Sequence, residues 1–267
     1  MSYGHDLVSI EALKTRIATL GGIGQGAVPA WAKRPDVSGT DAPPMAPLAV
    51  DALDRALPWG GLPTGCLHEV AAGAAADGAA AGFAATLLGR LTQAEGARAR
   101  PLLWCTAGNG FYGPGLAGYG LDTSRLILVR GRAQADLLWA MEEGLRSGAV
   151  AAVLGELQEA ELTVTRRLQL AAEAGRSTAL LLRPAECKAM PSAAVTAWRI
   201  AAAPSGPARW GSGLGAERWR VELARCRGGV PHHWLLEWND ETHRLVVAAE
   251  LRDRPALAPD ELRRLAS

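Results

Sequence analysis

Short apolar runs alternate with amphipathic segments through the middle of the chain. The runs are nearly continuous, as strands buried on both faces of a parallel sheet are, and they occupy 66–71, 101–106, 125–129, 149–154 and 178–182. The intervening segments show apolar residues at helical spacing and occupy 79–95, 111–119, 133–147 and 159–174, with a further short helix expected at 49–57. This order predicts right-handed βαβ units, and therefore an α/β fold whose mostly parallel sheet is flanked by helices on both faces.

The pattern changes after residue 190, where strand patterns follow one another without helices between them. They occupy 194–203, 217–225, 233–238 and 245–251. In the second of them, Trp219, Val221 and Leu223 alternate with Arg218, Arg220 and Glu222. Alternation with a period of two places the first three residues on one face and the charged residues on the other. We expect these four strands to extend the C-terminal side of the sheet in antiparallel fashion.

The two ends of the chain differ from this core, residues 47–252. Residues 1–22 contain one apolar stripe on an expected helix, made of Ile10, Leu13, Ile17 and Leu20. The stripe could fold back on its own domain or dock on a partner. Residues 23–46 are rich in Gly, Pro and Ala and are expected to form a flexible linker. Residues 253–267 form a tail with a short helix expected at 259–266.

Bulk composition excludes several classes of protein. The net charge is +1, so no general attraction to polyanions follows. The four cysteines lack zinc-site spacing, and no metal site is predicted. No apolar run reaches the roughly 18 residues of a membrane span. The N-terminus lacks the features of a signal peptide, so we expect a cytoplasmic protein.

A phosphate-binding frame lies where the first apolar run ends. Gly73 and Gly78 enclose four residues, which is the glycine spacing of a P-loop between a strand and a helix. The lysine and the Ser/Thr that should follow are replaced by Ala79 and Ala80. Two interpretations remain: the glycines make only a strand-to-helix turn, or backbone N–H groups still bind nucleotide weakly.

The approach to this loop resembles the RecA family of recombinases. The resemblance rests on Gly60-Gly61-Leu62-Pro63-Thr64-Gly65 followed by a strand with Glu69, and more weakly on Tyr119-Gly120-Leu121-Asp122 and on 146–150. It implies a RecA-like P-loop NTPase core. It also places Gly108 where RecA has its water-activating glutamate, Glu156 at the magnesium-side acid, and Arg183 or Pro184 at the γ-phosphate-sensing glutamine. The two intervals in which RecA has its long DNA-binding loops are short in this chain. A vestigial site at Gly73, Gly78 and Glu156, without ATPase activity or a required cofactor, is the expectation.

This set of losses resembles the inducible mutagenesis protein A (ImuA) family of degenerate RecA-like proteins. The resemblance implies a non-catalytic accessory or scaffold in SOS-induced translesion DNA synthesis, nucleoid-associated when induced. The implied partners are a Y-family polymerase-like protein (ImuB) and a C-family DNA polymerase paralogue. RecA, single-stranded DNA and a second copy of the chain are further candidates. Two alternatives stay open: a SulA-like cell-division inhibitor, and a weakly ATP-binding recombinase paralogue that binds single-stranded DNA.

Arginines and tryptophans mix in the C-terminal third, as they do in single-strand binders. Candidate residues for nucleic-acid or partner binding are Arg209, Trp210, Arg218, Arg220, Arg225 and Arg227. The alternative is that Trp219 is a core residue and the strand arginines are a solvated face. Among the histidines, His68 is expected to be a satisfied core residue, while His232 and His233 should point to opposite faces of a strand.

Overall fold

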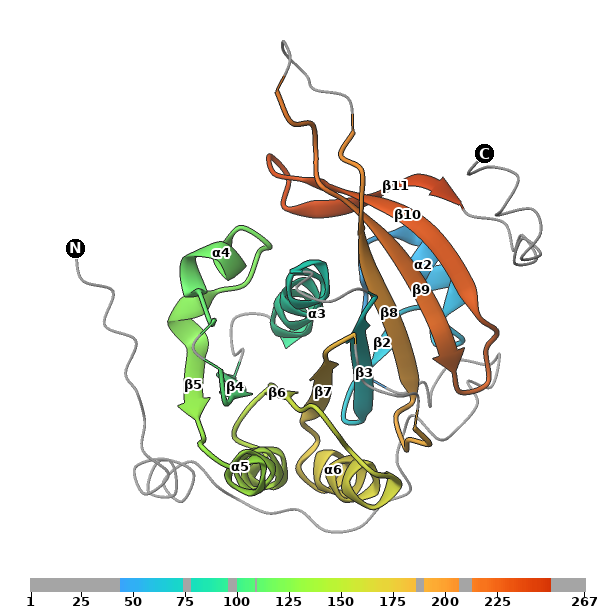
Figure 1. The fold of residues 1–267 in the computed structure, drawn as a ribbon. Coiled ribbons are helices and arrows are strands. Elements are labelled where there is room, and N and C mark those ends of the chain that lie inside the picture. Colours follow the sequence, from blue (N-terminus) through green and yellow to red (C-terminus); the bar gives the residue numbers. More distant parts are fainter. Residues whose placement is uncertain are drawn as a thin grey trace, which may run out of the picture.

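The computed structural model describes residues 44–73, 78–95, 100–108, 110–185, 190–206 and 213–250. Most of them surround one nine-stranded sheet with the order β11-β10-β9-β8-β3-β7-β6-β4-β5 (Figure 1). Its strands are β3 (Leu67–Ala72), β4 (Leu102–Thr106), β5 (Leu126–Arg130), β6 (Ala152–Glu156), β7 (Thr178–Arg183), β8 (Thr196–Ala203), β9 (Arg218–Cys226), β10 (His232–Asn239) and β11 (Arg244–Glu250). All five predicted apolar runs are therefore strands, with ends shifted by a few residues.

Strand direction divides the sheet into two parts. The six neighbouring strands β5, β4, β6, β7, β3 and β8 run parallel to one another. Strands β9, β10 and β11 are antiparallel additions beside β8. The expectation of four antiparallel additions was wrong for the first of them, because β8 pairs in parallel with β3, with Ala71 beside Arg199. The alternation of apolar residues reports which face of a strand is buried, but it does not report the direction of the neighbouring strand.

Helices cover both faces of the parallel part. Helix α3 (Ala79–Glu95) lies on one face, and α5 (Gln134–Ser147) and α6 (Leu162–Gly175) lie on the other (Figure 1). Shorter elements are α2 (Asp51–Ala56), α4 (Gly113–Ala117) and the 3-10 turn η3 (Thr123–Arg125). A two-stranded sheet, β1 (Met45–Ala46) with β2 (Leu62–Pro63), was not predicted. It joins the end of the expected linker at 23–46 to the Gly60–Gly65 stretch.

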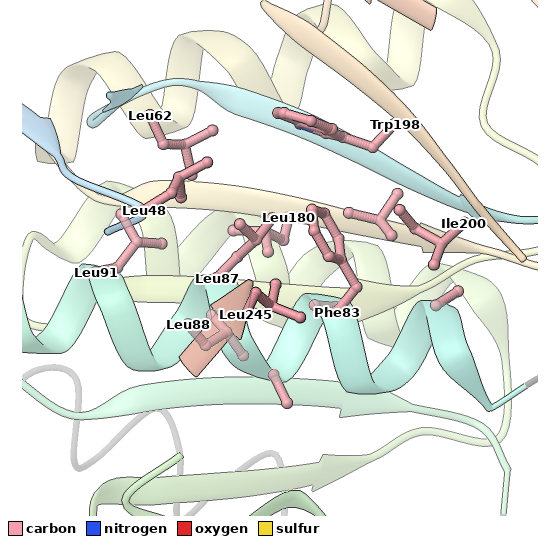
Figure 2. Packing of buried hydrophobic residues seen from close by; sticks show 14 of the residues in the cluster. Leu48, Leu62, Phe83, Leu87, Leu88, Leu91, Leu180, Trp198, Ile200 and Leu245 are labelled. Carbon is pink, nitrogen blue, oxygen red and sulfur yellow. The ribbon is translucent and has the colours of Figure 1, made fainter. Parts of the chain in front are cut away.

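The larger core lies between α3 and the curved sheet. Phe83, Leu87, Leu88 and Leu91 point from α3 toward residues of β7, β8 and β11 (Figure 2). The Phe83 ring lies 5.5 Å from that of Trp198, centroid to centroid. Full burial of a side chain of this size contributes about 1.5–3 kcal/mol. Helix α3 is therefore held in place by packing along its length, from the end of the glycine loop onward.

Close contact between α5 and α6 explains the glycine at the end of α6. Gly175 is the last residue of that helix, and Arg176 takes the left-handed conformation at φ 52°. A Cβ at position 175 would clash with the backbone carbonyl oxygen of Leu145, at the end of α5. The glycine is thus required by the approach of two helices. The ion pair between Arg167 and Glu142 also joins these helices, at 2.8 Å.

Both predicted end segments lie outside the described residues. This applies to the N-terminal helix with Ile10, Leu13, Ile17 and Leu20, to most of the 23–46 linker, and to the helix at 259–266. Across the part of the chain that is described, no helix is long and apolar enough to cross a membrane. The parallel strands end at one edge of the sheet, and that edge is where an α/β protein carries its site.

Candidate functional site

The glycine frame of a P-loop has the predicted strand-to-helix layout. Strand β3 ends at Ala72, Gly73 follows, and α3 begins directly after Gly78. The Gly73 N–H donates to the carbonyl of Ile200 at 2.5 Å. A Cβ at position 73 would lie 2.6 Å from the Cβ of Ala201, whereas one at 78 would meet nothing within 4 Å. The first glycine is therefore required by the neighbouring strand β8, whatever the loop binds.

The two alanines after the loop belong to the hydrophobic core. Ala79 is 3% exposed and Ala80 is 2% exposed, and both join the cluster that contains Phe83. An active P-loop has at these positions an amine for the phosphates and a hydroxyl for the metal ion. Positions 79 and 80 therefore supply no side-chain group for phosphate or metal at the start of α3.

Glu156, the acidic residue expected at the magnesium side, is engaged by its own protein. It lies at the end of β6, beside the end of β4. Its Oε1 accepts a hydrogen bond from the indole N–H of Trp104 at 2.6 Å, and its Oε2 accepts one from the Thr106 hydroxyl at 2.7 Å. Thr106 Oγ1 accepts in turn from the N–H of Gly108, at 3.0 Å. Both carboxylate oxygens therefore stabilise the β4–β6 edge; this network gave no signal in the sequence.

Arg183, expected near the nucleotide-sensing position, lies at the end of β7 and is 5% exposed. Its guanidinium lies 4.0 Å from the carboxylate of Glu69 on the adjacent strand β3. Glu69 is also buried, at 7%. Burying opposite charges together limits the desolvation cost that either would incur alone. This pair places two opposite charges inside the sheet, close to the start of the glycine loop.

Hydrogen bonds of His68 connect the turn before β3 with strand β8. Trp198 Nε1 donates to Thr196 Oγ1 at 2.8 Å, and Thr196 Oγ1 lies 2.8 Å from His68 Nδ1. His68 Nε2 lies 2.9 Å from the Pro63 carbonyl oxygen. Because an indole only donates and a carbonyl only accepts, the Thr196 hydroxyl donates to Nδ1 and the Nε2–H donates to Pro63. Burial lowers the pKa of His68 to about 4, which confirms the expected core histidine.

Arginines on the C-terminal strands differ in what they contact. Arg218 pairs with Glu237 at 2.7 Å, and Arg225 donates to the Ser192 carbonyl at 2.9 Å. Arg220 is exposed and makes no ion pair within the described chain. Arg227 is exposed in the turn after β9.

Trp219 is fully buried, as its place in the alternating pattern suggested. Arg209 and Trp210 lie outside the described residues, so their proposed role stays a prediction. The ion pair of Arg199 with Glu222, at 3.0 Å on the same sheet face, was not predicted. Cross-strand partners become visible only once the register is known.

Thiols and metal-binding groups add no further site in the part of the chain that the structure describes. Cys66, Cys105 and Cys226 are free and buried, and burial raises the thiol pKa of each. Protonated buried thiols are poor nucleophiles. Among the residues that the structure describes, no three His, Cys, Asp or Glu side chains gather as a metal site would require.

The fold and the altered P-loop together define a RecA-like protein. The crystal structure of the RadB recombinase superposes with a TM-score of 0.54, over 77% of this chain and all of that chain, at 13% identity. The likeness to RadB thus concerns the fold. No family model matches the sequence.

Curated relatives give the family. The chain is 39% identical over 245 residues to Protein ImuA of Caulobacter vibrioides, in two strains, and the match covers 85% of this chain and 98% of that protein. The chain therefore belongs to the ImuA family. It is also 35% identical over 102 residues to the cell division inhibitor SulA of Edwardsiella piscicida, which covers 38% of this chain and 61% of that protein.

Proposed function

We propose that this chain is a non-catalytic RecA-like accessory protein of SOS-induced translesion DNA synthesis, which binds polymerase partners as a scaffold. The proposed loss of catalysis is supported by the side chains at the nucleotide site. Ala79 and Ala80 are packed in the core, and the Glu156 carboxylate accepts two hydrogen bonds from its own protein. The proposed role in translesion synthesis is supported by membership of the ImuA family.

The missing groups account for a large share of phosphoryl-transfer chemistry. Each charge-assisted hydrogen bond from a P-loop lysine is worth about 1.5–3 kcal/mol in binding. Its contribution grows in the transition state, where catalysis depends on positioning and on neutralising charge. Gly108 has no side chain to activate an attacking water. The chain requires no cofactor in this proposal, and any nucleotide would be held by backbone groups alone.

A phosphate-release assay tests the loss of catalysis directly. The full chain should show no steady turnover of ATP, with or without single-stranded DNA, beside an active RecA-type recombinase as positive control. The Ala79→Lys/Ala80→Thr variant should also stay inactive, because Gly108 remains. Both positions are buried, so the larger side chains should destabilise the fold by about 1–3 kcal/mol. Steady turnover by the unmodified chain would contradict the proposal.

Binding to purified polymerases tests the role. We expect the full chain to bind the Y-family polymerase-like protein, and through it or directly the C-family paralogue. Deletion of residues 1–43, which removes the expected Ile10/Leu13/Ile17/Leu20 stripe and keeps β1, should weaken this association. Deletion of 253–267 serves as a comparison at the other end of the chain. An unchanged affinity would place the interface in the core. RecA, a second copy and single-stranded DNA are secondary candidates for the same assay.

One observation favours a second function. The match to the cell division inhibitor SulA spans 102 residues. A division inhibitor should bind the tubulin-like division protein and produce filamentous cells when overexpressed. Polymerase binding without filamentation would favour the accessory role, and the opposite pattern would favour the inhibitor.

A further inference from the structure

The layer of helices on one face of the sheet stops before strand β8. Helices α5 and α6 cover β4, β6, β7 and β3 on this face. Arg199 of β8 lies beside Ala71 of β3 in register, so its side chain continues the same face. Beyond it, none of the described helices packs on β8, β9 and β10 from this side (Figure 1). We name this surface the β8–β10 outer face.

Charges on the β8–β10 outer face are arranged around one arginine. Arg199 and Glu222 form an ion pair at 3.0 Å toward one end of the strands. Arg218 and Glu237 form another at 2.7 Å, two residues away on the other side of Arg220. Arg220 stands between the two pairs, is exposed, and makes no ion pair within the part of the chain that is described. At the centre of the face the Arg220 charge therefore has no carboxylate partner among the described residues. Arg225, toward the end of β9 on the same face, also forms no ion pair there and donates to the Ser192 carbonyl.

The side chains next to Arg220 are small or apolar. Ala201 of β8 and Leu235 of β10 lie directly opposite it on the neighbouring strands, and both are half-buried. Three strands at about 4.8 Å spacing make a platform wide enough for one helix or extended segment. An arginine at the centre of a flat, partly apolar patch is a frequent energetic centre of protein interfaces.

The same face is poorly suited to single-stranded nucleic acid. Nonspecific binders of single strands combine a run of positive charge with exposed aromatic rings on which bases stack. Here Trp198, Trp219 and Trp234 all point to the opposite face and are buried in the α3 core. Glutamates neutralise the arginines on both sides of Arg220. The observations thus favour a protein ligand over a nucleic acid.

We propose that the β8–β10 outer face docks an acidic segment of the Y-family polymerase-like partner, a site that rests on the proposed function. A partner carboxylate pairs with the Arg220 guanidinium, and apolar side chains beside that carboxylate contact Ala201 and Leu235. The flanking ion pairs select against a ligand with adjacent negative charges, because Glu222 and Glu237 would repel them. Arg220 can pair bidentately with one carboxylate, and a lysine could not reproduce this geometry.

The test compares binding of the purified Y-family polymerase-like protein to the full chain and to three variants. Arg220→Glu should weaken binding by about 10- to 100-fold, the range expected for losing a charge-assisted hydrogen bond. Arg220→Lys should lie between that variant and the unmodified chain. Arg166→Glu, an exposed charge reversal on α6, should bind as the unmodified chain does. Circular dichroism confirms that the exposed substitutions leave the fold intact.

Each contrary outcome has a distinct meaning. If the unmodified chain binds the polymerase-like protein and Arg220→Glu binds equally well, the docking site is wrong while the proposed function stands. If the unmodified chain shows no binding, the proposed function fails and the docking site with it. If Arg220→Glu leaves polymerase binding unchanged but weakens binding of a single-stranded oligonucleotide at low salt, the face is a nucleic-acid site and the protein-docking proposal is overturned.

Discussion

Lowering the pH from about 7.5 to about 4.5 should destabilise this protein through a single buried residue, His68. The ring is fully buried, its Nδ1 accepts from Thr196, and its Nε2–H donates to Pro63. Protonation would place a second N–H at Nδ1, facing the Thr196 hydroxyl. That hydroxyl already accepts from Trp198, so it would have to turn its own hydrogen away from Nδ1 and accept from both N–H groups, inside a fully buried site.

Linkage gives the magnitude and the sign. The pKa of His68 is lowered from 6.5 to about 4 in the folded state. Between these values the unfolded chain binds a proton that the folded protein does not, so stability falls as pH falls through this window. At about 1.4 kcal/mol per pH unit the full difference is about 3.5 kcal/mol, of which about 2.5 kcal/mol is lost by about pH 4.5. The stabilising contribution of neutral His68 is fully present above the pKa that this residue has in the unfolded chain.

Urea unfolding followed by tryptophan fluorescence measures the effect, because Trp198 belongs to the network and its environment changes on unfolding. The free energy of unfolding is compared between the two pH values for the unmodified chain and for His68→Gln, whose side chain does not titrate. The unmodified chain should lose about 2.5 kcal/mol more than the variant. His243→Gln, at an exposed histidine, controls for loss of an imidazole. Equal losses in the unmodified chain and His68→Gln would refute the reasoning.

Two further predictions concern the altered nucleotide site. Gly73→Ala should destabilise the fold by about 1–3 kcal/mol, because its Cβ would overlap that of Ala201. Gly78→Ala, the control, should change the melting temperature little. Similar effects of the two substitutions would mean that the contact of Gly73 with β8 is not decisive. Glu156→Ala should cost about 2–3 kcal/mol, since it leaves the N–H of Trp104 and a neighbouring hydroxyl without an acceptor. Glu156→Gln should recover part of this loss in thermal unfolding, and an unaffected melting temperature in the alanine variant would show the network to be dispensable.

Much of the fold could be predicted because its information is local. Continuous apolar runs identified five of the six parallel strands, and helical spacing identified α3, α5 and α6. The same reasoning placed Trp219 in the core, since it alternates with charged neighbours along one strand. The missing lysine and hydroxyl after Gly78 were visible directly. Each of these features depends only on residues close together in the chain.

Prediction failed where the deciding contacts join distant residues. Strand β8 is parallel to β3 although its sequence resembles that of the antiparallel strands that follow. A glycine at a helix end, such as Gly175, is typical of a helix cap, but the role of Gly175 is set by Leu145 of another helix. In both cases the sequence pattern is compatible with two arrangements, and packing against a remote element selects one.

The sequence by itself determined the class of fold, the loss of the P-loop side chains and the alternation that lines β9 with arginines. The tertiary structure alone decided which arginines are neutralised, because strand pairing brings Glu237 of β10 to Arg218 and Arg199 of β8 to Glu222. It likewise decided that His68 meets Thr196, 128 residues away, to form a buried donor chain. Hydrophobic period is a short-range property, whereas ion pairs and buried hydrogen bonds depend on which distant segments the fold brings together.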